Sequence, residues 1–225
     1  MERQWCHEKD VQPEQVHRSE LTLFDFRAPE DRAEVDDGST WRVWTDEVMG
    51  GKSTCSWTSS EEDGGKAIFA GTLSKFVPKG TSRSGFAAVQ MVTPKPLKDV
   101  TEFDALKLRV KLDHNKYEIN IKPESFIPDD LYQGFLMNES SPAKDGWVDA
   151  ILPFRDFLLL GRGLVKQDQR AFDYNIMEAL GFATNDYEGD FKIEIQSAKV
   201  ICLEGESGDD ARTQNLKPAQ TTTSF

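Results

Sequence analysis

The segment TDEVMGGKSTCSW, residues 45–57, brings together residue types that bind phosphate or catalyse reactions in other proteins. Asp46 and Glu47 precede the pair Gly50–Gly51, and a run of hydroxyl side chains follows it. A phosphate-binding P-loop needs four residues between its first glycine and a Gly-Lys-Ser/Thr, and it connects a strand to a helix. This segment has neither that spacing nor a helical pattern after it. We therefore interpret Gly50–Gly51 as a tight turn before a strand whose one face carries Ser53, Cys55 and Trp57.

Nucleophilic catalysis needs a nucleophile, a base and a third group that orients the base. The candidate bases are three histidines, His7, His17 and His114. The first two lie in a polar N-terminal segment, and His114 lies in LDHNKY, whose polar run is typical of a hairpin turn. The sequence therefore offers no Ser-His-Asp or Cys-His set, and it predicts a protein that is not an enzyme.

Carboxylates could also do chemistry, because glycosidases work with a pair of them. Near the ends of apolar segments the acids form two clusters, Asp46 with Glu47, and Glu124 with Asp129 and Asp130. Acids are rarely buried, so we interpret them as solvated turn residues. Hydrolysis by Glu124 or Asp129 is therefore the weakest of the functional hypotheses, behind two binding functions that are described below.

Metal binding has little support in the sequence. Cys6, His7 and His17 lack the paired-ligand spacing of zinc sites. The segment PESFIPDD lacks the repeated Asp/Asn spacing of a calcium loop. The sequence predicts no metal and no cofactor.

Charge and hydropathy narrow the class of protein further. The 27 basic and 39 acidic residues give a formal charge of −12, which disfavours general attraction to nucleic acid or to an anionic membrane. A local basic patch is still compatible with this total. The longest dense apolar run, AILPFRDFLLL, is interrupted by proline and charged residues, so no transmembrane helix is predicted. The cysteines are too few and too scattered for a disulfide framework, which favours a reducing compartment.

The N-terminal segment MERQWCHEKDVQPEQV carries no recognisable import signal. It lacks the apolar core of a secretory signal, and its acidic residues do not suit an organelle transit peptide. A cytoplasmic location therefore stays open.

The middle of the chain alternates apolar and polar residues in many short segments, as strands do when one face lies on a core and the other in water. In FDALKLRVKL, for example, Leu106, Leu108 and Val110 alternate with Lys107 and Arg109. The predicted strands are LTLFDF, WRVW, STCSW, AIFAGTL, FAAVQMV, FDALKLRVKL, YEINIK, YQGFLM, WVDAIL, FKIEIQ and AKVICL. Single helical turns are expected near 154–160 and 175–180.

So many short strands predict an all-β fold, a two-sheet β-sandwich of the jelly-roll type with one or two short helical turns. No repeat or linker divides the chain, so residues 21–203 are expected to form one domain. Residues 1–20 and 204–225 are polar and nearly free of large apolar side chains. We interpret them as an N-terminal arm and a disordered C-terminal tail.

Several motifs occur in the order and spacing of a known family. They are LFDF at 23–26, Trp41 with TDEVMGGKS, FAGTLS at 69–74, TSRSGFAA at 81–88, FDALKLRV, YEINIK, WVDAILPFRDF at 147–157, LGFA at 180–183 and GDFKIEI at 189–195. In these motifs the chain resembles the complex I intermediate-associated protein 30 family over residues 21–203. The resemblance implies a galactose-binding-like jelly roll that acts without catalysis, as an assembly chaperone for membrane-arm intermediates of mitochondrial respiratory complex I.

The resemblance also implies partners and a place in the cell. The partners would be complex I subunits and other assembly factors, on the matrix side of the mitochondrial inner membrane. Any membrane association would be peripheral and would run through those partners. No nucleic acid is expected.

The candidate site residues lie on outward strand faces and in loops. The candidate partner-binding residues on the outward faces of neighbouring strands are Arg109, Asn120 and Lys122, and those in loops are Asp46, Met49, Arg83 and Gln133. Gly50, Gly51 and Gly85 are expected to allow tight turns. The alternative hypothesis is a carbohydrate-binding jelly-roll module that uses the same face, with Asn120 and Tyr132 in contact with the sugar.

Overall fold

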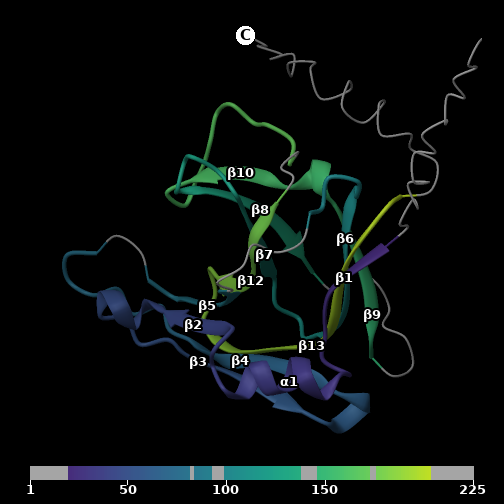
Figure 1. Cartoon of the computed structure of the whole chain (residues 1–225). Coiled ribbons are helices and arrows are strands. Elements are labelled where there is room, and N and C mark those ends of the chain that lie inside the picture. Colours follow the sequence, from purple (N-terminus) through teal and green to yellow (C-terminus); the bar gives the residue numbers. More distant parts are fainter. Residues whose placement is uncertain (1–19, 82–83, 93–98, 138–145, 173–175, 204–225) are drawn as a thin grey trace, which may run out of the picture.

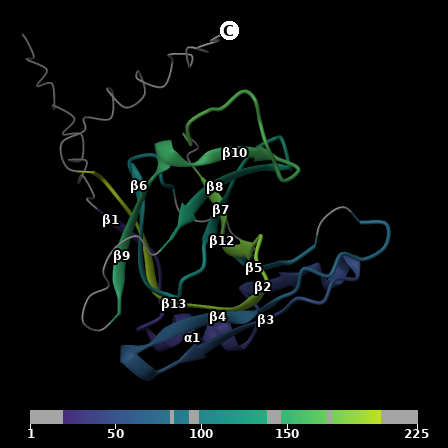
Figure 2. The same ribbon diagram turned by 180° about the vertical axis from the view of Figure 1, so that it is seen from behind.

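The computed structural model describes residues 20–81, 84–92, 99–137, 146–172 and 176–203. Strands dominate these residues and form two antiparallel sheets packed face to face (Figure 1, Figure 2). The predicted all-β jelly-roll sandwich is thereby confirmed. Of the predicted arm at 1–20, only Glu20 is described, and it begins a strand. Among the described residues there is no helix of the length and apolar character needed to span a bilayer.

One sheet has six strands. Its order is β3 (Thr54–Ser60), β4 (Lys66–Leu73), β13 (Gly189–Ile201), β6 (Ala105–Leu112) and β9 (Val148–Pro153), and β1 (Glu20–Asp25) also pairs with β13. Along one edge of β13, β4 pairs with the first part of the strand and β1 with the last part. β6 pairs along the other edge, so β13 joins three strands that are far apart in the sequence.

The other sheet has seven strands. Its order is β11 (Leu164–Val165), β10 (Leu158–Gly161), β8 (Asp130–Leu136), β7 (Tyr117–Pro123), β12 (Met177–Asn185), β5 (Phe86–Met91) and β2 (Trp41–Thr45). This sheet is curved, and its outer face lies on the concave side (Figure 1). We call this surface the concave face.

The core fills the space between the two sheets, as strand alternation requires. Fully buried side chains come from both, among them Leu108 and Ile193 of the six-stranded sheet and Ile119 and Phe182 of the other. Aromatic rings join the sheets at one end, where the centroids of Trp41 in β2 and Trp57 in β3 lie 4.8 Å apart. The strand face that was predicted to carry Ser53 and Trp57 lies on the core side, since both side chains are buried.

Every predicted strand segment overlaps an observed strand, but the prediction near 175–180 is wrong. Residues 173–175 lie outside the described part, and Met177 begins strand β12 instead of a helical turn. Both faces of β12 are buried, with large residues such as Leu180 and Phe182 inside and small ones such as Gly181 outside. The polar alternation that marks a half-exposed strand is therefore absent, and pairing with β5 and β7 decides the structure.

The segments FKIEIQ and AKVICL, predicted as two strands, form the single strand β13. A register shift between Ile195 and Ser197 changes the phase of the alternation. Ile193 and Ile195 point inward before it, and Ala198 and Val200 after it. A β-bulge of this kind lets one long strand keep its apolar residues on the core side.

Helix is scarce in the described residues, as predicted. The turn expected near 154–160 is confirmed in its first part as the 3₁₀ turn η3 (Phe154–Asp156), whereas Leu158–Gly161 form strand β10. The helix α1 (Pro29–Asp36) was not predicted, although its start carries a proline and acidic residues in the first turn. Val35 is its buried residue. Asp36 fixes its end by accepting hydrogen bonds from the backbone N–H and hydroxyl of Ser59 in β3. The remaining 3₁₀ turns are η1 (Asp46–Met49) and η2 (Glu62–Gly64).

Candidate functional site

A row of polar side chains crosses the concave face. The strand registers place Gln133, Asn120, Gly181, Gln90 and Arg42 opposite one another on β8, β7, β12, β5 and β2. Directly paired residues of antiparallel strands point to the same face. The side chains of Gln133, Asn120, Gln90 and Arg42 therefore form one line, which we call the polar row. Within it, the Gln133 amide Nε2 donates a hydrogen bond to Asn120 Oδ1 at 3.1 Å.

No large side chain projects from β12 in the middle of the concave face, because the outward residues there are small. Gly181 has no side chain, and a Cβ there would lie 2.9 Å from the Val89 carbonyl oxygen. Its neighbours on the same face of β12 are Ala179 and Ala183. The half-buried amides of Asn120, Gln133 and Gln90 are therefore not hidden by larger side chains beside them in β12.

Charged groups flank the polar row on both sides. On one side, Lys122 forms an ion pair with Glu178, 3.0 Å from nitrogen to oxygen. On the other, the Glu118 carboxylate accepts a hydrogen bond from Asn185 at 2.9 Å. Burial raises the pKa of Glu118, and the Asn185 hydrogen bond partly opposes this rise. The face thus offers donors and acceptors of hydrogen bonds and groups of both charges, which suits recognition of a polar partner.

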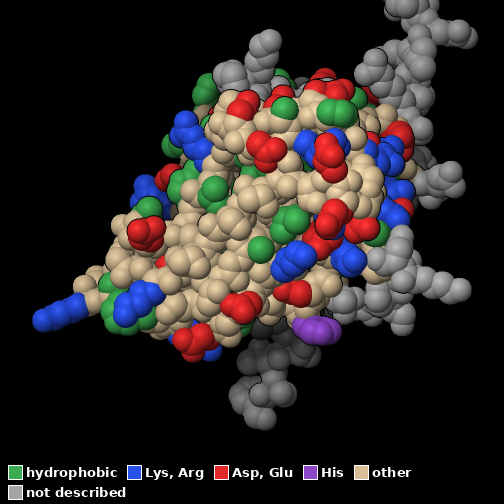
Figure 3. All heavy atoms as spheres, turned by 90° about the horizontal axis from the view of Figure 1, so that it is seen from below, with side chains coloured by type: hydrophobic (Ala, Val, Ile, Leu, Met, Phe, Trp, Pro, Cys, Tyr) green, Lys and Arg blue, Asp and Glu red, His purple; other side chains and the backbone are tan. Residues whose placement is uncertain are grey.

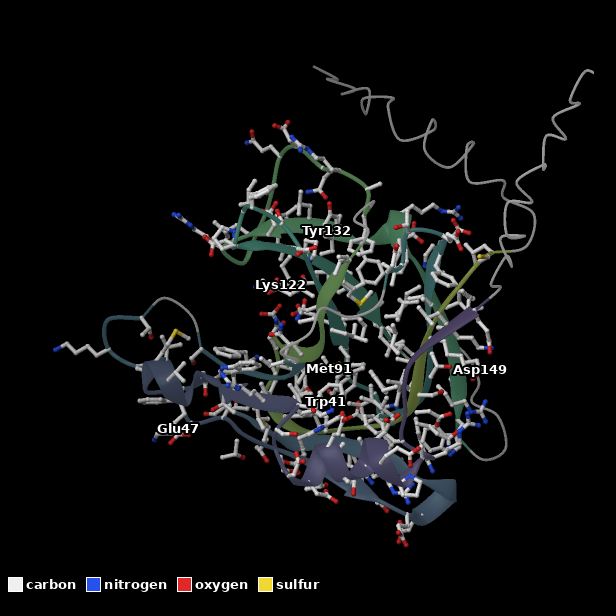
Figure 4. The ribbon with its side chains drawn as sticks, in the orientation of Figure 1. Trp41, Glu47, Met91, Lys122, Tyr132 and Asp149 are labelled. Atoms are coloured by element: carbon white, nitrogen blue, oxygen red, sulfur yellow. The ribbon has the colours of Figure 1, made fainter. Side chains whose placement is uncertain are left out.

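Arg109 does not belong to this face, contrary to the expectation that it neighbours Asn120 and Lys122. It lies on β6, in the six-stranded sheet, where its guanidinium contacts Asp149 at 3.1 Å. In Figure 4, Lys122 lies near the middle of the view and Asp149 toward its right-hand side, in the other sheet. The reason is the turn between β6 and β7, which carries the chain from one sheet to the other. His114 is exposed in this turn, and the prediction that it lies in a hairpin is wrong.

Asp46 is fully buried, which corrects its assignment as a partner contact. Its carboxylate accepts hydrogen bonds from the Ser53 N–H (2.9 Å), the Ser53 hydroxyl (3.0 Å) and the Gly85 N–H (2.6 Å). A Cβ on Gly51 would lie 2.1 Å from Asp46 Cγ, so glycine is required there. Gly50 and Gly85 both have positive φ, at 83° and 81°, as the predicted tight turns demand. Asp46 therefore fixes the two turns to each other.

The other candidate residues have separate locations. Met49 is 40% exposed at the end of η1, so it stays available to a partner. Arg83 lies outside the described residues. Tyr132 is buried in β8, and its hydroxyl donates to the Ala171 carbonyl oxygen at 3.2 Å (Figure 4). The predicted contact of Tyr132 with a sugar is therefore wrong. Phe126, in the loop between β7 and β8, is fully exposed.

The candidate catalytic carboxylates have ordinary surroundings. Glu124 and Asp129 are exposed, and Asp129 pairs with Arg162 at 3.1 Å. Asp130 is buried instead of solvated, and it forms an ion pair with Lys166. In the part of the chain that the structure describes, no group of His, Cys, Asp and Glu residues could hold a metal ion. Cys6, His7 and His17 lie outside it.

An open hollow of about 330 Å³ lies beside the concave face at its β2 end. It is lined by Val43, Trp44, Thr45, Glu47, Val48 and Cys55. Cys55 is a free cysteine, and burial raises the pKa of its thiol to about 11. A thiol with so high a pKa is a poor nucleophile at neutral pH, so the hollow has no catalytic group of this kind.

We expect Cys55 to react slowly with iodoacetamide in the folded protein. The rise in pKa from 9.0 to about 11 lowers the thiolate fraction on the order of a hundredfold. Mass spectrometry of the peptide that contains Cys55 measures the rate, and the same protein in urea is the control. Equal rates in the folded and unfolded protein would contradict the assigned burial.

Sequence reasoning missed two members of the polar row, Gln90 and Arg42. Both stand at outward positions of correctly predicted strands, FAAVQMV and WRVW. Alternation alone could have placed them on an outer face. Their alignment with Asn120 depends on strand order and register, which the sequence pattern does not give.

Solved structures of low sequence identity share the fold. The family 11 carbohydrate-binding module of the cellulosomal cellulase Lic26A-Cel5E of Clostridium thermocellum superposes with a TM-score of 0.58 at 15% identity. The match covers 82% of this chain and 95% of that module. At this identity the similarity shows the jelly-roll fold alone.

Sequence relatives are more specific. Complex I intermediate-associated protein 30, mitochondrial, of Mus musculus is 29% identical over 180 residues, which cover 75% of this chain and 54% of the relative. The Drosophila melanogaster protein of that name is 30% identical over 188 residues, 77% of this chain and 60% of the relative. The chain thus spans little more than half the length of these relatives. A sequence model described as complex I intermediate-associated protein 30 (CIA30) matches residues 24–195. The chain belongs to the complex I intermediate-associated protein 30 family.

Proposed function

We propose that this chain is a noncatalytic assembly factor that binds intermediates of mitochondrial respiratory complex I and other assembly factors, with the concave face as its docking surface. The family match over residues 24–195 carries the proposal, because that range includes the strands that form the polar row. The names of the relatives support a mitochondrial location, on the matrix side of the inner membrane in this proposal. We further propose that residues 21–203 act as one domain.

The chemistry of the described residues supports a binding role. His114 is exposed in a turn, and the Cys55 thiol has a raised pKa. The hydroxyl of Ser53, in the segment that first suggested chemistry, donates to the Asp46 carboxylate and accepts from the Ser74 N–H at 3.0 Å. The Ser53 hydroxyl thus holds the fold together, and none of the three groups pairs with another as a nucleophile and base.

The polar row supports docking of a protein surface. Its amides can both donate and accept hydrogen bonds, and Lys122, Glu178 and Arg42 add charges of both signs. Such complementarity of polar groups sets the specificity and register of an interface more than its raw affinity. The concave shape adds contact area around a partner that fits into it.

Affinity capture from mitochondria tests the proposal. The wild-type chain is expected to retrieve complex I subunits and other assembly factors, identified by mass spectrometry. The double variant Asn120→Ala with Gln133→Ala should retrieve them about tenfold less, since a well-placed polar contact in an interface contributes on the order of 1.4 kcal/mol or more. Ser56→Ala with Thr58→Ala removes exposed hydroxyls from β3 in the other sheet and is the matched control.

Two outcomes would count against the proposal. If the wild-type chain retrieves no respiratory subunit or assembly factor, the function is wrong. If capture is normal but the Asn120 and Gln133 variant behaves like the control, the function stands and the docking surface lies elsewhere.

Sugar binding on the same face is the second candidate. The observation that favours it is the row of amides, because amide groups hydrogen bond well to hydroxyls. Binding of the chain to a broad glycan panel, lost in Asn120→Ala, would support this candidate. A panel without any binding would exclude it, and it would leave the capture experiment unaffected.

A further inference from the structure

A lobe projects from the sandwich beside the concave face. It consists of residues 45–52, which include η1, and residues 74–81, which follow β4. The two segments pack together: a Cβ on Gly50 would lie 3.5 Å from the Pro78 ring, and Lys52 Nζ lies 4.3 Å from the centroid of the Phe76 ring. The lobe lies on the opposite side of the molecule from the start of β1 and the end of β13 (Figure 1, Figure 2).

The lobe exposes large apolar side chains. The exposed fractions are 74% for Val48, 40% for Met49, 46% for Phe76 and 51% for Val77. A single exposed apolar residue needs no explanation, but four in two adjoining segments form an apolar surface of the kind that binding sites use. The hydrogen bonds of Asp46 to Ser53 and Gly85 hold this surface in place.

The same lobe is basic, in a protein whose formal charge is −12. Lys52, Lys75 and Lys79 are exposed on its two segments. Of the two acids in these segments, Asp46 is buried and Glu47 is exposed. Figure 3 shows the molecule narrowing toward this end, where basic and hydrophobic side chains lie together.

We propose that the lobe binds the surface of an anionic phospholipid bilayer. The apolar side chains Val48, Met49, Phe76 and Val77 enter the boundary between headgroups and acyl chains. Lys52, Lys75 and Lys79 stay at the level of the phosphates, because long lysine stems reach back from apolar surroundings to polar ones. The attraction of each lysine to an anionic surface is short-ranged and weakened by salt.

The geometry favours a bilayer over a protein partner for this lobe. Stable protein interfaces bury about 800 Å² on each side and are well packed over that area. The lobe presents four large apolar side chains and three lysines, far fewer than the roughly 20–30 residues on each side of such an interface. A projection of this size suits insertion into a fluid surface that closes around it. The concave face next to the lobe remains free for a protein partner. This inference does not depend on the proposed assembly function.

Co-sedimentation of the full chain with vesicles tests the lobe. Vesicles of equal parts phosphatidylcholine and phosphatidylglycerol are expected to bind the wild-type protein, and vesicles of phosphatidylcholine alone to bind it much less. The triple variant of Lys52, Lys75 and Lys79 to Gln should lose binding about a hundredfold, from about fivefold for each lysine. Added salt should weaken wild-type binding in the same direction.

The apolar part of the lobe has a matched control. Phe76→Ser with Val77→Ser should lower vesicle binding at least tenfold, since two exposed apolar side chains no longer enter the bilayer. Leu164→Ser with Val165→Ser changes side chains that are each 59% exposed, on β11, and should bind as the wild type does. Circular dichroism confirms that each variant is folded.

The proposal is overturned if the wild-type protein does not bind the mixed vesicles, or if the Phe76 and Val77 variant binds as well as the Leu164 and Val165 control. The variant of Asn120 and Gln133 should bind vesicles normally. Loss of partner capture without loss of vesicle binding, or the reverse, therefore separates the two proposals.

Discussion

Replacing Lys66 by alanine is expected to lower the free energy of unfolding by about 3 kcal/mol. Lys66 and Glu194 form an ion pair of 2.8 Å between β4 and β13, and their side chains are only 5% and 7% exposed. Without Lys66, the Glu194 carboxylate loses its buried partner and stays out of water. Lys192 still contacts Glu194 at 2.5 Å, which keeps the loss at the lower end of the range for broken buried pairs.

The loss should depend on pH in a defined direction. Burial alone would raise the pKa of Glu194, but the hydrogen bonds from Lys192 and Lys66 outweigh it and lower the pKa below 4.5. The ionised carboxylate thus stabilises the folded state above pH 4.5, and this contribution disappears as the pH falls through the lowered pKa. The difference between wild type and Lys66→Ala should therefore shrink in acid.

Urea unfolding near neutral pH and again below pH 4.5 measures both effects. Lys107→Ala is the matched control, because Lys107 and Asp149 are 36% and 42% exposed, and such pairs contribute less than about 1 kcal/mol. A Lys66→Met, Glu194→Leu double variant should recover most of the stability, since it leaves no buried charge unpaired. A loss below about 1 kcal/mol in Lys66→Ala would contradict the role of the pair.

Asp46→Ala is expected to cost about 2–4 kcal/mol, because it leaves the buried N–H groups of Ser53 and Gly85 without an acceptor. The Ser53 hydroxyl can turn to another acceptor, so the two backbone donors account for most of the cost. Unfolding in urea measures the change. Glu47→Ala, at the exposed neighbouring position, should stay within about 0.5 kcal/mol of the wild type.

Asp46→Ala should also loosen the lobe, because the Asp46 carboxylate links the turn at Gly51 to the N–H of Gly85. Hydrogen exchange of the amides in residues 45–52 and 74–81 is expected to speed up in Asp46→Ala and to stay unchanged in Glu47→Ala. The prediction is contradicted if Asp46→Ala is as stable as the wild type and its amides exchange at the wild-type rate. Water would then satisfy the N–H groups of Ser53 and Gly85 as well as the carboxylate does.

The alternation of apolar and polar residues predicts most strands of this fold, and the exceptions have physical causes. β12 was missed because its outward positions carry small residues such as Gly181 instead of polar ones. The alternation of apolar and polar residues is therefore absent. β10 was missed because it is a short apolar run, LLLG, that periodicity cannot assign. The helix α1 depends on a single buried residue, Val35, which leaves little pattern to detect.

The candidate site could be predicted only in part. Asn120 and Lys122 were correctly placed on an outer strand face, because each follows the alternation of its own strand. Gln133 was predicted to lie in a loop, which is wrong, because it pairs with Asn120 from within strand β8. Arg109 follows it equally well, but alternation does not say which sheet a strand joins. Asp46 was taken as exposed because acids usually are, and its burial depends on donors from Gly85, which is distant in sequence.

The position of β13 decides when, during folding, the six-stranded sheet can be completed. β13 is the last described strand, yet β1, β4 and β6 all pair with it. Until residues 189–201 are in place, β1 lacks the strand it pairs with in the described residues, and β4 and β6 each have an unpaired edge. We infer that the chain depends on protection from aggregation until β13 has paired, since these long-range pairings cannot be replaced by local ones.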